Sequence, residues 1–361
     1  MYIEDEAVVL GIAFEDDEIQ QLVTDKGAKR ALLYKRMTRP ANVGDRIIVN
    51  MTATELALGT GGWDIVRFVH APKQKKEWMI GDARGHIMKA RYTPIQHSVL
   101  AVEAQESKYH DHFQEPFTLA GHPVWLAELH SMVPLIYYVL KEMNKGLHCC
   151  VIFDDQAALP LPFSEQLRKL HKEVNFSSIT VGQSFGGQYE AINITSALQY
   201  AAVILHADVI VISVGPGVVG TGTYYGFSGM SQSHWSHTVS ALGGVPIWIP
   251  RISFADKRKR HYGISHHTLT PLGQFTFKES IVPIPYVNER QKKVIKQQID
   301  SASFHVGHDI RFAEEDHVSE FVKKALQHAP LPIQTMGRKY EDDPAFFLAV
   351  AEALRVGLAL M

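Results

Sequence analysis

The feature that most constrains the fold is an alternation of strand-like and helix-like segments after about residue 95. Short apolar runs typical of buried strands recur there, and most of them precede a segment that favours a helix. Such alternation predicts a mostly parallel, doubly wound sheet with helices on both faces, an α/β fold. The expected strands cover residues 98–102, 148–153, 177–181, 208–214 and 245–249. The expected helices cover residues 122–143, 164–172, 188–202, 232–242, 289–299, 316–327 and 344–360.

The part of the chain before residue 95 has a different character. Four short β-type segments, at residues 7–14, 30–35, 46–50 and 65–70, are separated by turn signals, and no long helical pattern lies between them. We therefore expect two domains: a small all-β barrel or sandwich over residues 1–95 and an α/β domain over residues 96–361. The polar stretch 73–89 is the expected connection.

Composition restricts the classes of function. Hydrophobic residues make up 46% of the chain, charged residues 20%, and the formal net charge is -2. This balance is typical of a globular protein and gives no electrostatic reason to bind nucleic acid or a membrane surface. The acidic start of the chain does not resemble a signal peptide, and no apolar run reaches the ~20 residues of a membrane span. We expect a cytoplasmic protein, with the adjacent Cys149 and Cys150 as reduced core residues.

Chemically useful residues follow the expected strands. Asp154 and Asp155 come after the strand expected at residues 148–153, residues 182–187 after strand 177–181, residues 215–217 after strand 208–214, and Arg251 after strand 245–249. The carboxyl ends of parallel strands meet at one edge of the sheet, where ligands bind. The sequence therefore predicts one small-molecule site at this edge, to which the second loop contributes Gln183, Ser184 and Gly186.

The most informative segment is the glycine loop, which we define as residues 215–229. Glycines allow backbone N–H groups to turn toward a ligand and to form an anion-binding nest. Hydroxyl groups in the same loop add hydrogen-bond donors. The alternative is a compact structural loop without a ligand. The candidate ligand-binding residues of the loop are Gly215, Gly217, Gly220, Thr221, Gly222, Thr223 and Ser228.

Two nucleotide-binding fingerprints fit the glycine loop poorly. Gly215, Gly217 and Gly220 have the G-x-G-x-x-G spacing, but the next helix is expected only from residue 232. An NADP-type site that uses Arg251 remains an alternative. A Walker A motif is excluded because Thr221 stands where lysine is required. No particular cofactor is predicted.

Ser184 lies in a G-x-S-x-G pattern between an expected strand and an expected helix. That context is typical of a nucleophile elbow, in which a sharp turn exposes the serine hydroxyl. The acid of a triad would be Asp208 or Asp256, and the base His266 or His267. The alternative is that Ser184 is a turn or ligand-contacting hydroxyl.

The 19 histidines make chance pairs common. The pairs His234/His237 and His305/His308 have no third ligand at a recognisable spacing, so no metal site is predicted. His266 and His267 follow a basic stretch, residues 257–260, and are candidates for proton transfer together with Asp154 and Asp155. The basic stretch can equally be a solvated surface loop. His130, within the expected helix 122–143, is interpreted as a core histidine.

The chain resembles an uncharacterised bacterial family known only as a domain of unknown function. The resemblance is densest at Leu129-His130-Ser131, residues 182–190, the glycine loop and the stretch Ser265-His266-His267-Thr268-Leu269-Thr270. The family pattern accepts alanine at the place of Ser184, which weakens the nucleophile interpretation. The resemblance implies no activity, cofactor or partner.

These observations favour a protein that binds, and in one version transforms, a small anionic or phosphorylated ligand at the glycine loop. Two alternatives remain: a serine hydrolase that uses Ser184, and a non-catalytic homo-oligomer. In the last case the apolar segment 346–361 would form a subunit contact. The other interpretation of this segment is a helix buried in the protein.

Overall fold

The structure is a computed structural model that describes residues 1–58, 61–70, 85–155 and 159–361. These residues form two compact units, Met1–Val99 and Leu100–Met361. Residues 73–84 of the connection expected from the sequence lie outside the described residues.

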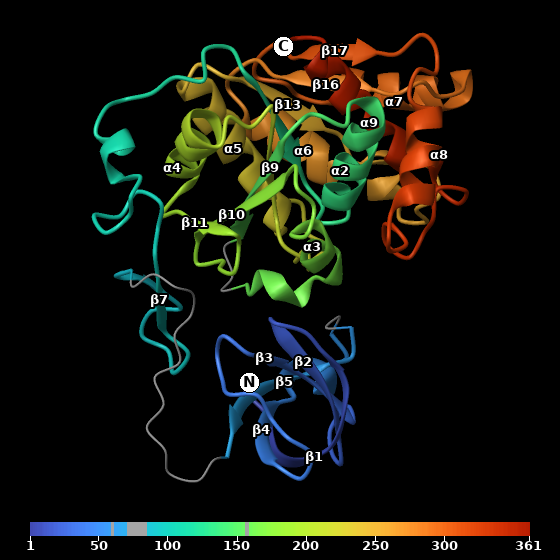
Figure 1. Cartoon of the computed structure of the whole chain (residues 1–361). Helices are drawn as coiled ribbons and strands as arrows, with labels where there is room; N and C mark the ends of the chain where they lie inside the picture. Colours follow the sequence, from blue (N-terminus) through green and yellow to red (C-terminus); the bar gives the residue numbers. More distant parts are fainter. Residues whose placement is uncertain (59–60, 71–84, 156–158) are drawn as a thin grey trace. The chain divides into compact units, whose positions relative to one another are not determined.

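The first unit contains a closed five-stranded barrel, so the expected barrel is confirmed (Figure 1). Neighbouring strands are antiparallel except β3 and β5, which are parallel. Closure leaves no unpaired sheet edge. The strands are β1 (Glu4–Glu15), β2 (Ile19–Thr24), β3 (Arg30–Tyr34), β4 (Arg46–Asn50) and β5 (Asp64–Val69), with a short helix α1 (Thr52–Glu55) before β5 and a separate hairpin of β6 (Ile87–Lys89) and β7 (His97–Val99) after it.

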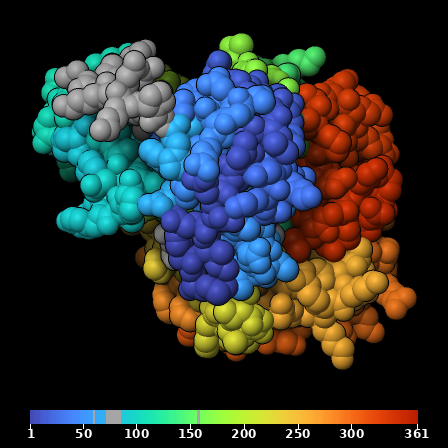
Figure 2. Space-filling model, turned by 90° about the horizontal axis from the view of Figure 1, so that it is seen from below, coloured from blue at the N-terminus to red at the C-terminus, as the bar shows by residue number. Residues whose placement is uncertain are grey.

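The barrel core consists of small and branched apolar side chains, among them Leu22, Leu33 and Ile47. Beyond the buried Ala7 and Val9, β1 turns apolar side chains outward, and Figure 2 shows this strand, in dark blue, at the surface of the barrel. β2 was not predicted from the sequence.

The second unit contains eight parallel strands in the order β11-β10-β9-β12-β8-β13-β16-β17, which confirms the α/β fold. The central strands are almost completely buried, as expected for a sheet covered on both faces. The bounds are β8 (Pro123–Ala127), β9 (Cys149–Asp155), β10 (Phe176–Gly182), β11 (Tyr189–Glu190), β12 (Val209–Ser213), β13 (Val245–Ile249), β16 (Ile281–Ile284) and β17 (Asp309–Phe312), with a small hairpin of β14 (Ile252–Ser253) and β15 (Gly263–Ile264).

Helices cover both faces of this sheet (Figure 1). Alternate strand residues enter two separate cores, so Cys149 and Cys150 point to opposite faces and are free, buried thiols as predicted. One face carries α2 (Met132–Met143), α3 (Glu165–Leu170), α8 (Ser319–His328) and α9 (Pro344–Leu358). The other carries α4 (Ile194–Gln199), α5 (Ser231–Ala241), α6 (His266–Phe275) and α7 (Glu289–Ser301).

The order of the strands creates a switch point at β8 and β12. The chain leaves β8 through α2 on one face, whereas it leaves the neighbouring β12 through α5 on the other face. Loops that diverge in this way leave a crevice at the carboxyl ends of the strands, which is where open α/β sheets bind ligands. The glycine loop follows β12, so the fold places it at this crevice.

Two predicted helices need correction. The helix expected over residues 122–143 is a strand, β8, followed by α2, so Glu128 and His130 lie in a strand-to-helix loop rather than inside a helix. The helix expected over residues 188–202 begins only at Ile194, because Tyr189 and Glu190 pair with β10 as β11.

The C-terminal helix α9 is packed inside the larger unit. Its side chains Phe346, Phe347 and Leu354 are buried within the chain's own core, which agrees with the interpretation as a buried helix. Among the described residues, no helix has the length and apolar character needed to cross a bilayer.

Gly357 provides a test of how tightly α9 is seated. A Cβ atom there would lie 2.6 Å from Cδ1 of Ile247 and overlap the indole of Trp125, which is fixed by a 2.8 Å hydrogen bond to the Ala353 carbonyl. We expect Gly357→Val to lower the free energy of unfolding by about 1–3 kcal/mol through overpacking. The control is Gly307→Val, where an added Cβ meets open space. Equal urea midpoints for the two variants would contradict this packing.

Candidate ligand-binding site

The glycine loop has an irregular backbone that keeps several N–H groups available. Gly217 and Gly222 have positive φ angles of 103° and 78°, a region that disfavours other residues. In the described chain the N–H groups of Gly217, Gly220 and Gly222 donate to no protein acceptor, whereas that of Thr221 donates to the Gly226 carbonyl at 2.8 Å. The loop therefore presents backbone donors near the switch point.

The loop does not continue directly into a helix. A single 3-10 turn, Ser228–Met230, precedes α5, which begins at Ser231, so the late helix start expected from the sequence is confirmed. A dinucleotide fingerprint places its pyrophosphate at a helix N-terminus that opens within the motif. The glycine loop lacks that geometry.

One side of the glycine loop borders a cavity of about 420 Å³, which we call the arginine cavity. Among the described residues, the lining contains three arginines and three histidines but no aspartate or glutamate, so its ionisable groups are all basic. This composition suits an anion. The lining residues are Leu129, His130, Ser131, Pro216, Gly217, Val218, Gly220, Gly222, Thr223, Phe227, Arg251, Arg258, Arg260, His261, His267, Thr335 and Met336.

A buried ion-pair network lies beneath this cavity. Oε1 of Glu128 is 3.3 Å from a guanidinium nitrogen of Arg251 and 3.1 Å from Nδ1 of His267, and the Thr268 hydroxyl donates to Oε2 at 3.3 Å. Burial alone would raise the pKa of Glu128, but the hydrogen bond from His267 and the charge of Arg251 outweigh it and lower the pKa. The buried carboxylate fixes Arg251 and His267 in place.

His261 is held in its neutral form beside the same network. Nε of Arg260 donates to Nε2 of His261 at 3.2 Å, and Nδ1 of His261 lies 2.7 Å from the Ser265 hydroxyl oxygen. Burial, together with the positive charges of Arg251 and Arg258, lowers the pKa of His261 to about 3. Ser265 also accepts from the His267 N–H at 3.1 Å and is thereby the N-cap of α6.

His130 enters the site from the loop after β8. Its Nε2 is 2.7 Å from the hydroxyl of Ser164, the N-cap of α3, and its Nδ1 is 3.4 Å from the Val214 carbonyl. Burial lowers the pKa of His130 to about 4. The imidazole is therefore neutral near pH 7, and it can accept or donate a hydrogen bond without adding charge.

The other side of the glycine loop borders a second cavity, of about 540 Å³, that contains Asp154 and Asp155. Pro216, Gly217 and Phe227 line both cavities. Burial raises the pKa of Asp154, although the indole N–H of Trp235 donates to its carboxylate and opposes the rise. The two aspartates thus face a different space from the arginines.

The predicted site residues are divided among three places. The arginine cavity is lined by Gly217, Gly220, Gly222, Thr223, Arg251 and His267, and the ring of His266 lies next to that of His267. The second cavity is lined by Asp154, Asp155, Thr221 and Ser228 in addition to Gly217. Gly215, Gln183, Ser184 and Gly186 line neither of these two cavities.

The placement of Ser184 does not support a catalytic triad. Its hydroxyl is buried and donates to the carbonyls of Phe153 and Val181. Ser184 follows β10, and two strands lie between β10 and β8 in the sheet. With a spacing of about 4.8 Å between neighbouring strands, β10 and β8 are about 14 Å apart. His267 reaches Glu128 directly after β8 and is therefore too far from Ser184 for a hydrogen bond.

The two candidate acids for that triad are also engaged elsewhere. Asp208 accepts from the His148 N–H just before β12, at the amino end of the strands, and Asp256 forms an ion pair with Arg258 at 2.7 Å. Gln183 and Gly186 belong to the turn between β10 and β11, where the Gly186 N–H donates to Glu190 at 2.7 Å.

Sequence reasoning did not select several residues of the site, chiefly Glu128, His261, Arg258 and Arg260. The sequence does contain a signal for Glu128, because this residue directly follows the apolar run of residues 123–127. A charge at the end of a buried segment needs partners, which makes it a candidate site residue. His261 and Arg260 lie in the basic stretch or next to it, but nothing in the sequence separated a site from a solvated loop.

Comparison with known proteins supports the family suggested by the motifs. A family described as "Protein of unknown function (DUF3866)" matches residues 30–354. No significant match was found among curated proteins or among solved structures. Since the match spans most of the sequence, the chain belongs to the DUF3866 family, whose members are proteins of unknown function.

Proposed function

We propose that this protein binds a small anionic ligand, with a phosphate or carboxylate group, in the arginine cavity. The observation that carries the proposal is the lining, which in the part of the chain that the structure describes consists of three arginines, three histidines and the glycine loop, without a carboxylate. Backbone N–H groups of the loop supply uncharged donors for the same group, in the manner of an anion nest.

The three arginines differ in how much charge they offer. Glu128 offsets the charge of Arg251, and Asp256 offsets that of Arg258. Arg260 is exposed, and among the described residues its guanidinium donates only to His261 and, at 3.4 Å, to the Gly222 carbonyl. Arg260 is therefore the cation best able to approach an incoming anion, while Arg251 is a fixed, buried part of the cavity wall.

The first test is binding of inorganic phosphate and pyrophosphate, followed by nucleotides, sugar phosphates and acyl-CoA compounds. Ligand at ~100 times its dissociation constant should stabilise the native state by about 2.7 kcal/mol, visible as a thermal shift. For the best probe we expect Arg260→Gln to weaken binding about 10- to 100-fold, the value of one hydrogen bond to a charged group. The control is Arg290→Gln, on the exposed side of α7.

A second variant tests the volume of the cavity rather than its charge. Gly220 has an ordinary φ, and an added Cβ would lie 3.5 Å from Phe227, so Gly220→Leu should fold while its side chain occupies the cavity. We expect it to abolish binding of the same probe, whereas Gly307→Leu should not. Unchanged affinity in both Gly220→Leu and Arg260→Gln would place the anion elsewhere and contradict the proposal.

A further inference from the structure

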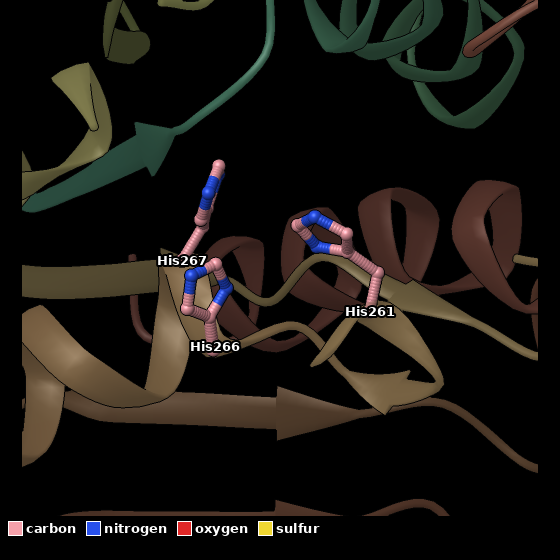
Figure 3. Close-up of side chains that lie close together, drawn as sticks. All are labelled: His261, His266 and His267. Carbon is pink, nitrogen blue, oxygen red and sulfur yellow. The ribbon is translucent and has the colours of Figure 1, made fainter. Parts of the chain in front are cut away.

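Three histidines gather next to the arginine cavity. His261 ends the 3-10 turn Lys259–His261, and His266 and His267 are the first two residues of α6. One ring nitrogen from each lies within 4.8 Å of the others, and Figure 3 shows the three rings side by side. Their sequence spacing, with four residues between His261 and His266, matches no common metal motif, which is why the pattern did not predict a metal.

Hydrogen bonds to the far side of two rings determine which nitrogen is available. Arg260 donates to Nε2 of His261, so this atom carries the lone pair and Nδ1–H donates to Ser265. Nδ1 of His267 faces the carboxylate of Glu128, which only accepts, so Nε2 of His267 is the available atom. A histidine whose second nitrogen donates to a carboxylate or hydroxyl is oriented as metal-binding histidines are.

The third histidine has an unsatisfied nitrogen. Nδ1 of His266 is buried and has no hydrogen-bond partner among the described atoms. A buried polar atom without a partner is unfavourable and needs an explanation in a native structure. Coordination of an ion would satisfy it.

We propose that His261, His266 and His267 bind one divalent transition-metal ion of the Zn²⁺ type. Imidazole ligands favour zinc and its neighbours over Mg²⁺ and Ca²⁺, which prefer oxygen. Bonds of 2.0–2.1 Å in tetrahedral geometry place the nitrogens about 3.4 Å apart, so the rings need to approach by about 1.4 Å at most. The exposed Arg260 side chain would leave His261 at the same time.

Three protein ligands leave a coordination position open, as in catalytic zinc sites. His261 and His267 line the arginine cavity, so that position is directed to the space proposed for the anion. Glu128 and Asp256 offset the charges of Arg251 and Arg258, which reduces the repulsion of a cation. An anion that coordinates the metal and contacts Arg260 would use both features, but metal binding itself does not depend on the anion proposal.

The experiment is a titration of untagged, chelator-treated protein with Co²⁺ in buffer without phosphate, followed by visible absorption and then by displacement with Zn²⁺. We expect a single saturable site with the intense absorption of four- or five-coordinate Co²⁺. His266→Ala removes a ligand outside the Glu128 network and should weaken Co²⁺ binding by more than the ~10- to 100-fold typical of losing a supporting residue. The control His317→Gln removes an exposed histidine and should leave binding unchanged.

Two outcomes would overturn the metal site: no saturable binding of one Co²⁺ by the folded wild-type protein, or equal affinity in folded His266→Ala and His317→Gln. If His266→Ala does not fold, His267→Gln and the wild-type titration decide the question. Because no anion is present, a failure here leaves the anion proposal standing, and loss of phosphate binding in Arg260→Gln leaves the metal proposal standing.

Discussion

Replacing Glu128 by Gln is expected to lower the free energy of unfolding of the larger unit by about 3–5 kcal/mol. The carboxylate is completely buried and lies 3.3 Å from Arg251, whose side chain is 6% exposed. The amide keeps the shape of the side chain but removes its charge, so the buried guanidinium loses its counter-charge. Urea unfolding at pH 7 measures the effect. Hydrogen exchange of the β8 amides identifies which urea transition is the unfolding of the larger unit.

The control for this prediction is another paired glutamate. Glu320 lies 2.8 Å from Lys323, but both side chains are well exposed, so Glu320→Gln should cost no more than about 0.5 kcal/mol. Replacing both members of the buried pair, as in Glu128→Leu with Arg251→Met, should restore most of the stability that Glu128→Leu alone removes. A double variant as unstable as the single one would show that the pair does not act through its charges.

The strands that were predicted correctly are those whose boundaries are marked in the sequence. Residues 245–249 of β13 are preceded by Gly243-Gly244 and followed by Pro250, and the predicted bounds are the observed ones. β8 was missed because only four residues separate its apolar run from that of α2, and none of the four is glycine or proline. Without such a break, a buried strand and a buried helix have the same apolar pattern.

β2 was missed for a different reason, a polar residue in the barrel interior. Gln20 is almost completely buried, and its side-chain amide exchanges hydrogen bonds of 3.1 and 2.7 Å with the backbone of Ala41. A buried glutamine is stable only when its groups are satisfied in this way. Propensity and alternation cannot anticipate a partner 21 positions away.

The candidate site was predictable to the extent that topology determines it. Parallel strands bring the glycine loop and Arg251 to one edge, and both line the arginine cavity. The contact of Glu128 with His267 joins residues 139 positions apart, and only the folded chain reveals it. The position of β12 between β9 and β8, which separates Ser184 from the histidines, is likewise a matter of strand order.

The stability of the larger unit is expected to fall as the pH decreases from about 6.5 to 4, with His130 contributing up to about 3 kcal/mol. The pKa of His130 is about 4 in the folded protein, against about 6.5 in an unfolded chain. The unfolded chain therefore binds the proton first as the pH decreases, which favours unfolding until the folded histidine is protonated too. At 1.36 kcal/mol per pKa unit, a difference of about 2.5 units gives the stated size.

The variant His130→Gln should remove this part of the pH dependence, because its amide can still bond to Ser164 but does not titrate. Urea midpoints measured at pH 7, 6, 5 and 4 should fall more steeply for the wild type than for the variant, since only the wild type loses the contribution of His130. The control variant is His317→Gln, which replaces an exposed histidine and should keep the wild-type slope. If the slope of His130→Gln equals that of the wild type, His130 is protonated in the folded protein near its ordinary pKa and is not the neutral imidazole that its burial beside Ser164 implies.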